Sequence, residues 1–263
     1  MKPVNNPALM HIIYNDMNRS GNQFYFFPPI DPSDTIDDPD DKFSFFVSHV
    51  RRIERILYVF GSYNPSLYYM QGYNEIISPL YFVMVSSRQL FDNNLDHVEA
   101  ITFHCFQHLM NGTAIQEFYL TDDNSSIIHN RLNIYQKILE KHLPHVAEIL
   151  DGLDIQPLQY AYKWINILFA REHPMPTTLI IWDSLFAHIE DLITFVYYIA
   201  VSRLFEVADK LNENDLADTV SKLQNIEIQN IYKVLRRAND LYIRDKYPSP
   251  LDIIKERFRL FKK

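Results

Sequence analysis

Arg19 is the first side chain in the sequence whose setting suggests chemistry. It follows Asp16 by three residues, at the end of a segment, Leu9–Met17, whose apolar residues recur at helical spacing. A guanidinium is planar and permanently charged, and it can donate two hydrogen bonds to an anion. The spacing also fits an exposed ion pair on one helix face, worth roughly 0–1 kcal/mol. Taken alone, the two residues favour that ion pair.

Gln71 is the second such side chain, within the stretch Tyr63–Pro79. Pro65 marks a turn there, and we expect a new helix capped by Ser66 to follow it and carry Gln71. A buried amide without partners costs roughly 1–3 kcal/mol, and the adjacent Gly72 costs about 1 kcal/mol inside a helix. The pattern therefore indicates either a functional amide with exposed backbone nearby or a buried amide that ties two helices together.

Two other patterns could indicate a metal site, and neither does so well. His104 and His108 have the spacing of zinc proteases, but Cys105 stands where those enzymes need a glutamate. The acidic segment Asp31–Asp41 lacks the glycine and the closing glutamate of a calcium loop. We expect no metal site, and we expect the acidic loop at about residues 28–42 to be disordered.

The elements that must position these residues are predicted to be helices. Only five glycines occur in 263 residues, whereas an all-β chain of this size needs many more in its turns. Apolar residues recur at helical spacing along most of the chain. We expect an all-α fold in one continuous domain, residues 1–263, with helices after residue 19 at about 47–60, 67–77, 95–109, 128–139, 146–150, 158–169, 179–186, 192–205, 211–223 and 226–241, and a last helix ending near Phe261.

Composition argues against several classes of protein. The net charge of −8 shows no nucleic-acid footprint, and the single cysteine, Cys105, cannot staple a fold. No apolar run approaches the ~18 residues of a membrane span. We therefore expect a cytoplasmic protein without an integral membrane segment, and no nucleic-acid partner.

Four motifs in the same order resemble TBC domains, the GTPase-activating domains for Rab GTPases. Tyr69–Ile76 reads YMQGYNEI and closely resembles the family's YxQGxN segment, while Ile13–Arg19 matches its IxxDxxR signature upstream. The remaining markers, which we interpret as structural, are Trp164, Arg171, Trp182 and Asp183.

The resemblance implies a function and residue roles. Arg19 would be an arginine finger inserted into the GTPase site, with Asp16 orienting its guanidinium. Gln71 would replace the GTPase's own glutamine and position the attacking water. The expected supporting residues are Ile13, Tyr69, Gly72 and Asn74.

The resemblance also has limits. TBC domains usually begin with further helices before IxxDxxR, so this chain is expected to lack the most N-terminal ones. The chain would need no cofactor, because GTP and Mg²⁺ come with the Rab, and there is no P-loop motif of its own. We expect a monomer recruited to endomembranes through the Rab. The alternative is a catalytically inactive Rab-binding scaffold on the same fold.

Overall fold

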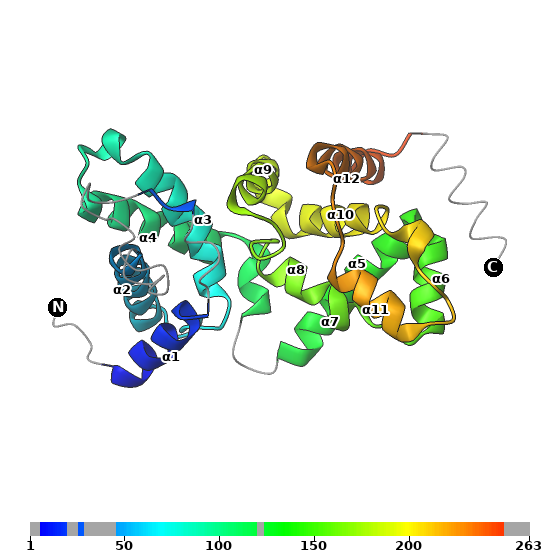
Figure 1. Cartoon of the computed structure of the whole chain (residues 1–263), viewed down its shortest axis with the longest axis horizontal. Helices are drawn as coiled ribbons and strands as arrows, with labels where there is room; N and C mark the ends of the chain where they lie inside the picture. Colours follow the sequence, from blue (N-terminus) through cyan, green and yellow to red (C-terminus); the bar gives the residue numbers. More distant parts are fainter. Residues whose placement is uncertain (1–5, 20–25, 29–45, 120–123, 250–263) are drawn as a thin grey trace, which may run out of the picture. The chain divides into compact units, whose positions relative to one another are not determined.

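A computed structural model of the chain describes residues 6–19, 26–28, 46–119 and 124–249 (Figure 1). These residues form helices and turns without a strand, as predicted for an all-α fold. The predicted acidic loop, apart from its first residue Pro28, and the predicted last helix both lie outside the described residues.

The described chain separates into two compact units. The first contains the described residues up to Ile128 together with Asn166–Trp182, and the second contains His129–Ile165 and the residues from Asp183 onward. We describe each unit by itself. The expectation of a single domain stays a prediction.

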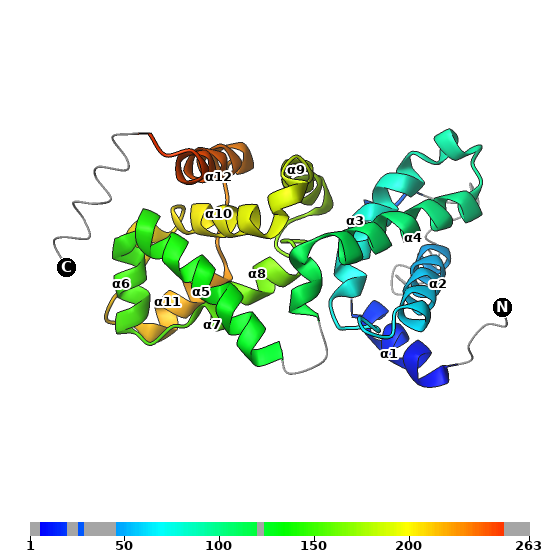
Figure 2. The same cartoon turned by 180° about the vertical axis from the view of Figure 1, so that it is seen from behind.

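The first unit contains the two motifs that lie farthest upstream. Its helices are α1 (Pro7–Met17), α2 (Val47–Tyr63), α3 (Tyr73–Ser86) and α4 (Leu95–Gly112), with the short 3₁₀ helices η2 (Arg88–Phe91) and η3 (Ala114–Phe118). Both views show α1 lying against α2, and α3 running beside α4 (Figures 1 and 2).

An aromatic core fixes these helices to one another. Phe60 of α2, Tyr73 of α3 and Phe106 of α4 are fully buried, and their rings meet edge to face at centroid distances of 4.9–5.7 Å. Such pairs add about 0.5–1.5 kcal/mol beyond the burial of their area. The apolar residues Val50, Ile53, Leu57 and Phe60 of α2 are buried, whereas Val47, which begins the helix, is 40% exposed.

The helices that follow are close to those predicted, although several begin or end a few residues away. They are α5 (Asn124–His142), α6 (Pro144–Gly152), α7 (Pro157–Tyr160), α8 (Tyr162–Asn166), α9 (Met175–Phe186), η4 (Ile189–Asp191), α10 (Leu192–Leu204), η5 (Ala208–Lys210), α11 (Leu216–Gln224) and α12 (Ile231–Lys246). Of these, α10 is apolar nearly all round and buried along most of its length, as predicted for a central helix.

The predicted helix through Gln71 is wrong. Residues 64–72 form a succession of turns, and α3 begins only at Tyr73. Gly72 is the N-cap of α3 and has a φ of +105°, which glycine adopts without a steric penalty. The glycine therefore ends a turn instead of weakening a helix.

Candidate functional site

The end of α1 separates a buried carboxylate from an exposed guanidinium. The helix is started by Asn6, whose side chain accepts a hydrogen bond from the backbone N–H of Leu9 at 3.1 Å. Near its other end, Asp16 is only 7% exposed, whereas 70% of the Arg19 side chain is exposed. Arg19 Nη1 lies 3.7 Å from Asp16 Oδ1, which is an ion pair but too long for a hydrogen bond. The guanidinium is thus guided by the carboxylate and still available to another molecule.

Two hydrogen bonds connect this end of α1 to the turns before α3. The Tyr69 hydroxyl donates to Asp16 Oδ2 at 3.1 Å, and Asn74 Nδ2 donates to the Asp16 carbonyl at 3.4 Å. Burial, followed by the negative charge of Asp16, raises the pKa of Tyr69 well above its usual range. Tyr69 therefore remains a protonated donor at any physiological pH.

Asn74 also organises the backbone beside Gln71. Its Oδ1 accepts a hydrogen bond from the N–H of Gly72 at 3.2 Å. Asn74 thus bridges Asp16 and Gly72, which joins the two sequence motifs that are 58 residues apart. The contacts place Asn74 beside both motifs, and its expected supporting role stays a prediction.

Gly72 is required by its own surroundings. A Cβ there would lie 3.1 Å from Ile167 Cγ2 and 3.3 Å from the Tyr119 hydroxyl oxygen, in addition to the strain of the positive φ. The hydroxyl of Tyr119 donates to the carbonyl of Asn166 at 2.6 Å, so it is not free to move away. The groups that approach the Gly72 backbone closely are therefore Ile167 and Tyr119 of this chain.

Gln71 is the exposed residue between two buried ones, Tyr69 and Gly72. Within the part of the chain that the structure describes, its side chain forms no hydrogen bond. An amide with no internal partner has both its donor and its acceptor available. The alternative interpretation, a buried amide tying two helices together, does not fit this position.

Glu75 and Arg171 extend the network, and sequence reasoning missed their relationship. Glu75 is 5% exposed, accepts from Asn74 Nδ2 at 3.3 Å, and lies 3.7 Å from Arg171 Nε. Arg171 itself is mostly exposed. Spacing gave no signal for this pair, because the two residues are 96 positions apart and Arg171 lies outside every predicted helix.

The remaining residues of the sequence motifs differ in burial and in the contacts they make. Ile13 is fully buried on α1, and Trp182 is buried with its Nε1 donating to the Leu168 carbonyl at 2.9 Å. Trp164 belongs to the second unit, where the guanidinium of Arg203 lies 4.5 Å above its ring. Asp183 lies inside α9 and is exposed.

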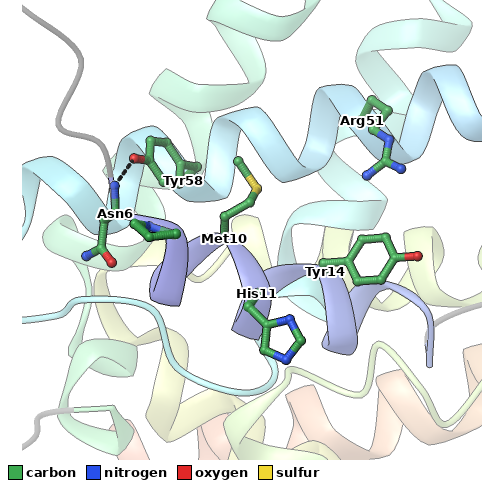
Figure 3. A pocket seen from close by; sticks show the side chains of 7 residues that line it. Asn6, Met10, His11, Tyr14, Arg51 and Tyr58 are labelled. Atoms are coloured by element: carbon green, nitrogen blue, oxygen red, sulfur yellow. Dashed lines mark hydrogen bonds between the residues drawn. The ribbon is translucent and has the colours of Figure 1, made fainter.

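An open groove of about 430 Å³ runs beside α1 where it faces α2 (Figure 3). Met10 and Tyr14 lie along it, and the guanidinium of Arg51 is 5.5 Å from the centroid of the Tyr14 ring. The backbone N–H of Asn6 donates to the Tyr58 hydroxyl at 2.8 Å at one end. The groove has no pair of carboxylates and no nucleophile with an adjacent base, so its residues suit contact with a partner more than chemistry.

Neither of the doubtful metal patterns gains support. No group of three or more His, Cys, Asp or Glu side chains suited to a metal occurs among the described residues. His104 and His108 are both exposed on α4. In the same residues, no helix has the length and hydropathy needed to cross a membrane.

The described residues thus combine a helical fold with an exposed arginine and an exposed glutamine beside one buried polar network, and comparison with known proteins identifies the family. Residues 30–211 match the family model of the Rab-GTPase-TBC domain. The chain belongs to this family. The match begins after Arg19, so it does not include the IxxDxxR segment.

Relatives with curated descriptions support the same assignment. Human TBC1 domain family member 13 is 28% identical over 197 residues, which cover 74% of this chain and 48% of that protein. The GTPase-activating protein gyp1 of Schizosaccharomyces pombe is 24% identical over 189 residues, covering 67% of this chain and 36% of the relative. The chain spans about half or less of the length of these relatives.

The fold is also found in solved structures. The Ypt/Rab-GAP domain of Gyp1p superposes with a TM-score of 0.65 at 19% identity, covering 90% of this chain and 80% of that one. A Chlamydomonas flagellar RabGAP TBC domain superposes with a TM-score of 0.59 at 16% identity, covering 90% and 73%.

Proposed function

We propose that this chain accelerates GTP hydrolysis by a Rab-family GTPase, supplying Arg19 and Gln71 in trans. The observation that carries the proposal is that the two proposed catalytic side chains are exposed while the residues around them are buried. Arg19 and Gln71 are exposed, whereas Asp16, Tyr69 and Asn74 are buried. Tyr69 and Asn74 both hydrogen-bond to Asp16, which is the ion-pair partner of Arg19, and Asn74 also holds the N–H of Gly72, the residue after Gln71. A buried frame that holds two exposed polar side chains suits insertion into a partner's site.

Arg19 would stabilise charge. Phosphoryl transfer places negative charge on the γ-phosphoryl oxygens, and arginine fingers of other GTPase activators are worth roughly 10³–10⁵ in rate. Asp16 would limit the orientations of the guanidinium through the ion pair at 3.7 Å. Because the pair is loose, Arg19 can leave it for a phosphate at small cost.

Gln71 would position the attacking water. Its carbonyl oxygen can accept from the water while its NH₂ donates to a phosphoryl or backbone oxygen. Gly72 and Asn74 fix the backbone that follows Gln71, through the positive φ and the hydrogen bond at 3.2 Å. The GTPase would bring GTP and Mg²⁺, so the chain would need no cofactor of its own.

We also propose that the protein acts as a monomer in the cytoplasm, meeting its Rab at endomembranes. A Rab-binding scaffold without activity is the alternative on the same fold. The test is a GTP-hydrolysis screen of the chain against a panel of Rab GTPases, paired with a binding measurement for each. Acceleration of at least one Rab supports the proposal, whereas binding without acceleration of any Rab would establish the scaffold.

A further inference from the structure

Helix α12 carries a charge opposite to that of the chain as a whole. It contains five basic and two acidic residues, a balance of +3 in a chain whose net charge is −8, so the rest of the sequence carries −11. The basic residues are Lys233, Arg236, Arg237, Arg244 and Lys246, and the acidic ones are Asp240 and Asp245. A positive segment on an acidic protein indicates an anionic partner.

One face of α12 packs against α10, and the opposite, outer face is therefore the exposed one. Val234 and Ala238 are fully buried, and the Ser202 hydroxyl on α10 donates to the Val234 carbonyl at 2.7 Å. Arg237 Nη1 donates to the Ser202 carbonyl at 3.0 Å. Both views show α12 lying along α10 (Figures 1 and 2). The helix therefore cannot turn its outer residues inward.

The outer face combines aromatic and basic side chains. Tyr232, Arg236, Ile243 and Tyr247 follow one another at intervals of four, seven and four residues, which places them in one stripe. Tyr232 is 63%, Ile243 46% and Tyr247 69% exposed. Among the large hydrophobic side chains that the structure describes, only Leu90, at 77%, is more exposed than Tyr247.

Three cations on this side have no counter-ion among the residues that the structure describes. Lys233, Arg236 and Arg244 are exposed, and none forms an ion pair within the described ranges. Asp240 is the exposed carboxylate among them. The balance of these four residues is +2, so the face remains positive.

The other charges of α12 are already occupied. Arg237 Nη1 lies 2.9 Å from Glu206 Oε1, and Lys246 is paired with Asp191. Asp245 is turned away from the outer face, because it binds His142 of α5 at 2.7 Å. These pairs hold the helix in place, and they leave recognition to the three unpaired cations and the exposed tyrosines.

We infer that the outer face of α12 docks on an anionic phospholipid membrane. Lysine and arginine near such a surface attract its headgroups, and tyrosine rings are favoured at the boundary between headgroups and acyl chains. Such a surface attracts α12, whereas it repels the acidic residues that give the rest of the sequence its charge of −11. A nucleic acid fits less well, because the aliphatic side chain of Ile243 within the stripe makes no favourable interaction with phosphates.

The test is co-sedimentation of the full chain with vesicles of phosphatidylcholine, with and without phosphatidylserine, at low and high salt. We expect binding that needs phosphatidylserine and weakens with salt. Each cation near the surface contributes roughly five-fold to the binding constant. The variant Lys233→Glu/Arg236→Glu should therefore bind at least ~25-fold more weakly. Both changes lie in the first two turns, where acidic residues suit the helix dipole.

The matched control is Lys137→Glu/Lys210→Glu, which changes the net charge equally at exposed positions outside α12. It should lose much less binding, and Lys233→Arg/Arg236→Lys should retain it. Circular dichroism checks that each variant is folded. The inference would be overturned by no binding to phosphatidylserine vesicles, equal binding to neutral vesicles, equal loss in the control, or a preference for single-stranded DNA in competition. The inference would also be overturned if the parent chain self-associates and the α12 variant does not, because the outer face would then bind a second copy of the chain.

Discussion

The hydroxyl of Tyr69 donates a hydrogen bond to the buried carboxylate of Asp16 at 3.1 Å, across 53 residues of sequence. The same carboxylate is the ion-pair partner of Arg19. One side chain thus links the two motifs, because the orientation of Asp16 depends on the donor that comes from the Tyr69 turn.

Removing this donor should reduce activity more than it reduces Rab binding. In Tyr69→Phe, Asp16 loses a buried hydrogen bond, which should cost about 1–3 kcal/mol of stability. If Asp16 orients Arg19, the maximal rate of stimulated hydrolysis should fall several-fold while the affinity for the Rab changes little. Stopped-flow hydrolysis and a binding titration measure the two effects.

Tyr73→Phe is the matched control for this prediction. Tyr73 is also buried on this segment, but its hydroxyl donates to the Leu67 carbonyl at 3.1 Å and not to Asp16. It should lose similar stability without a specific loss of rate. Equal losses of rate in the two variants would mean that Tyr69 acts only through stability.

Gly72→Ala should destabilise the first unit by roughly 1–3 kcal/mol. The new residue would be held at a φ of +105° with its Cβ 3.1 Å from Ile167. Chemical denaturation measures the effect. Gly152→Ala is the control, because no atom lies within 4 Å of its Cβ, and a helical alanine there should be neutral or stabilising by about 1 kcal/mol. Similar behaviour of the two variants would contradict the account of Gly72.

Asp245 should contribute stability that disappears in acid. Burial raises the pKa of this carboxyl, but hydrogen bonds from His142, Tyr198 and Lys141 outweigh burial and bring the pKa to about 2. Because the folded pKa is below the ordinary value of about 3.8, the stability is present above pH ~4 and is lost as the pH falls toward 2.

The variant Asp245→Asn tests this contribution. It should lower the free energy of unfolding by about 1–3 kcal/mol at neutral pH, and its stability should fall less steeply than that of the parent chain between pH 4 and pH 2. Denaturation at several pH values measures both. Parallel curves for the variant and the parent would show that the carboxylate does not contribute.

The sequence predicted the helical class and most helices, because those depend on apolar periodicity, which is local. It failed at residues 67–72, where the apolar run Leu67–Tyr73 resembles a helix but a positive φ at Gly72 and the contacts with Tyr119 and Ile167 impose turns. The Glu75–Arg171 pair could not be predicted either, since it depends on tertiary packing. The proposed roles of Arg19 and Gln71 came from motifs alone and stay predictions.

The two-finger mechanism makes a further prediction for Arg19. Arg19→Ala should abolish most stimulation and leave the fold intact, because 70% of the side chain is exposed. Arg19→Lys should fail nearly as badly, since a point charge cannot replace the bidentate guanidinium. Thermal denaturation provides the control for folding. Near-normal stimulation by Arg19→Lys would contradict the need for the two hydrogen bonds that a guanidinium donates.

The most direct test is single-turnover GTP hydrolysis by a Rab whose own catalytic glutamine has been changed to leucine. If Gln71 positions the water, the parent chain should still accelerate this Rab, because the missing amide is supplied in trans. Gln71→Ala should lose most activity on the normal Rab while binding it nearly as well. The contrary result is a glutamine-to-leucine Rab that is not accelerated, together with a Gln71→Ala chain that still activates the normal Rab.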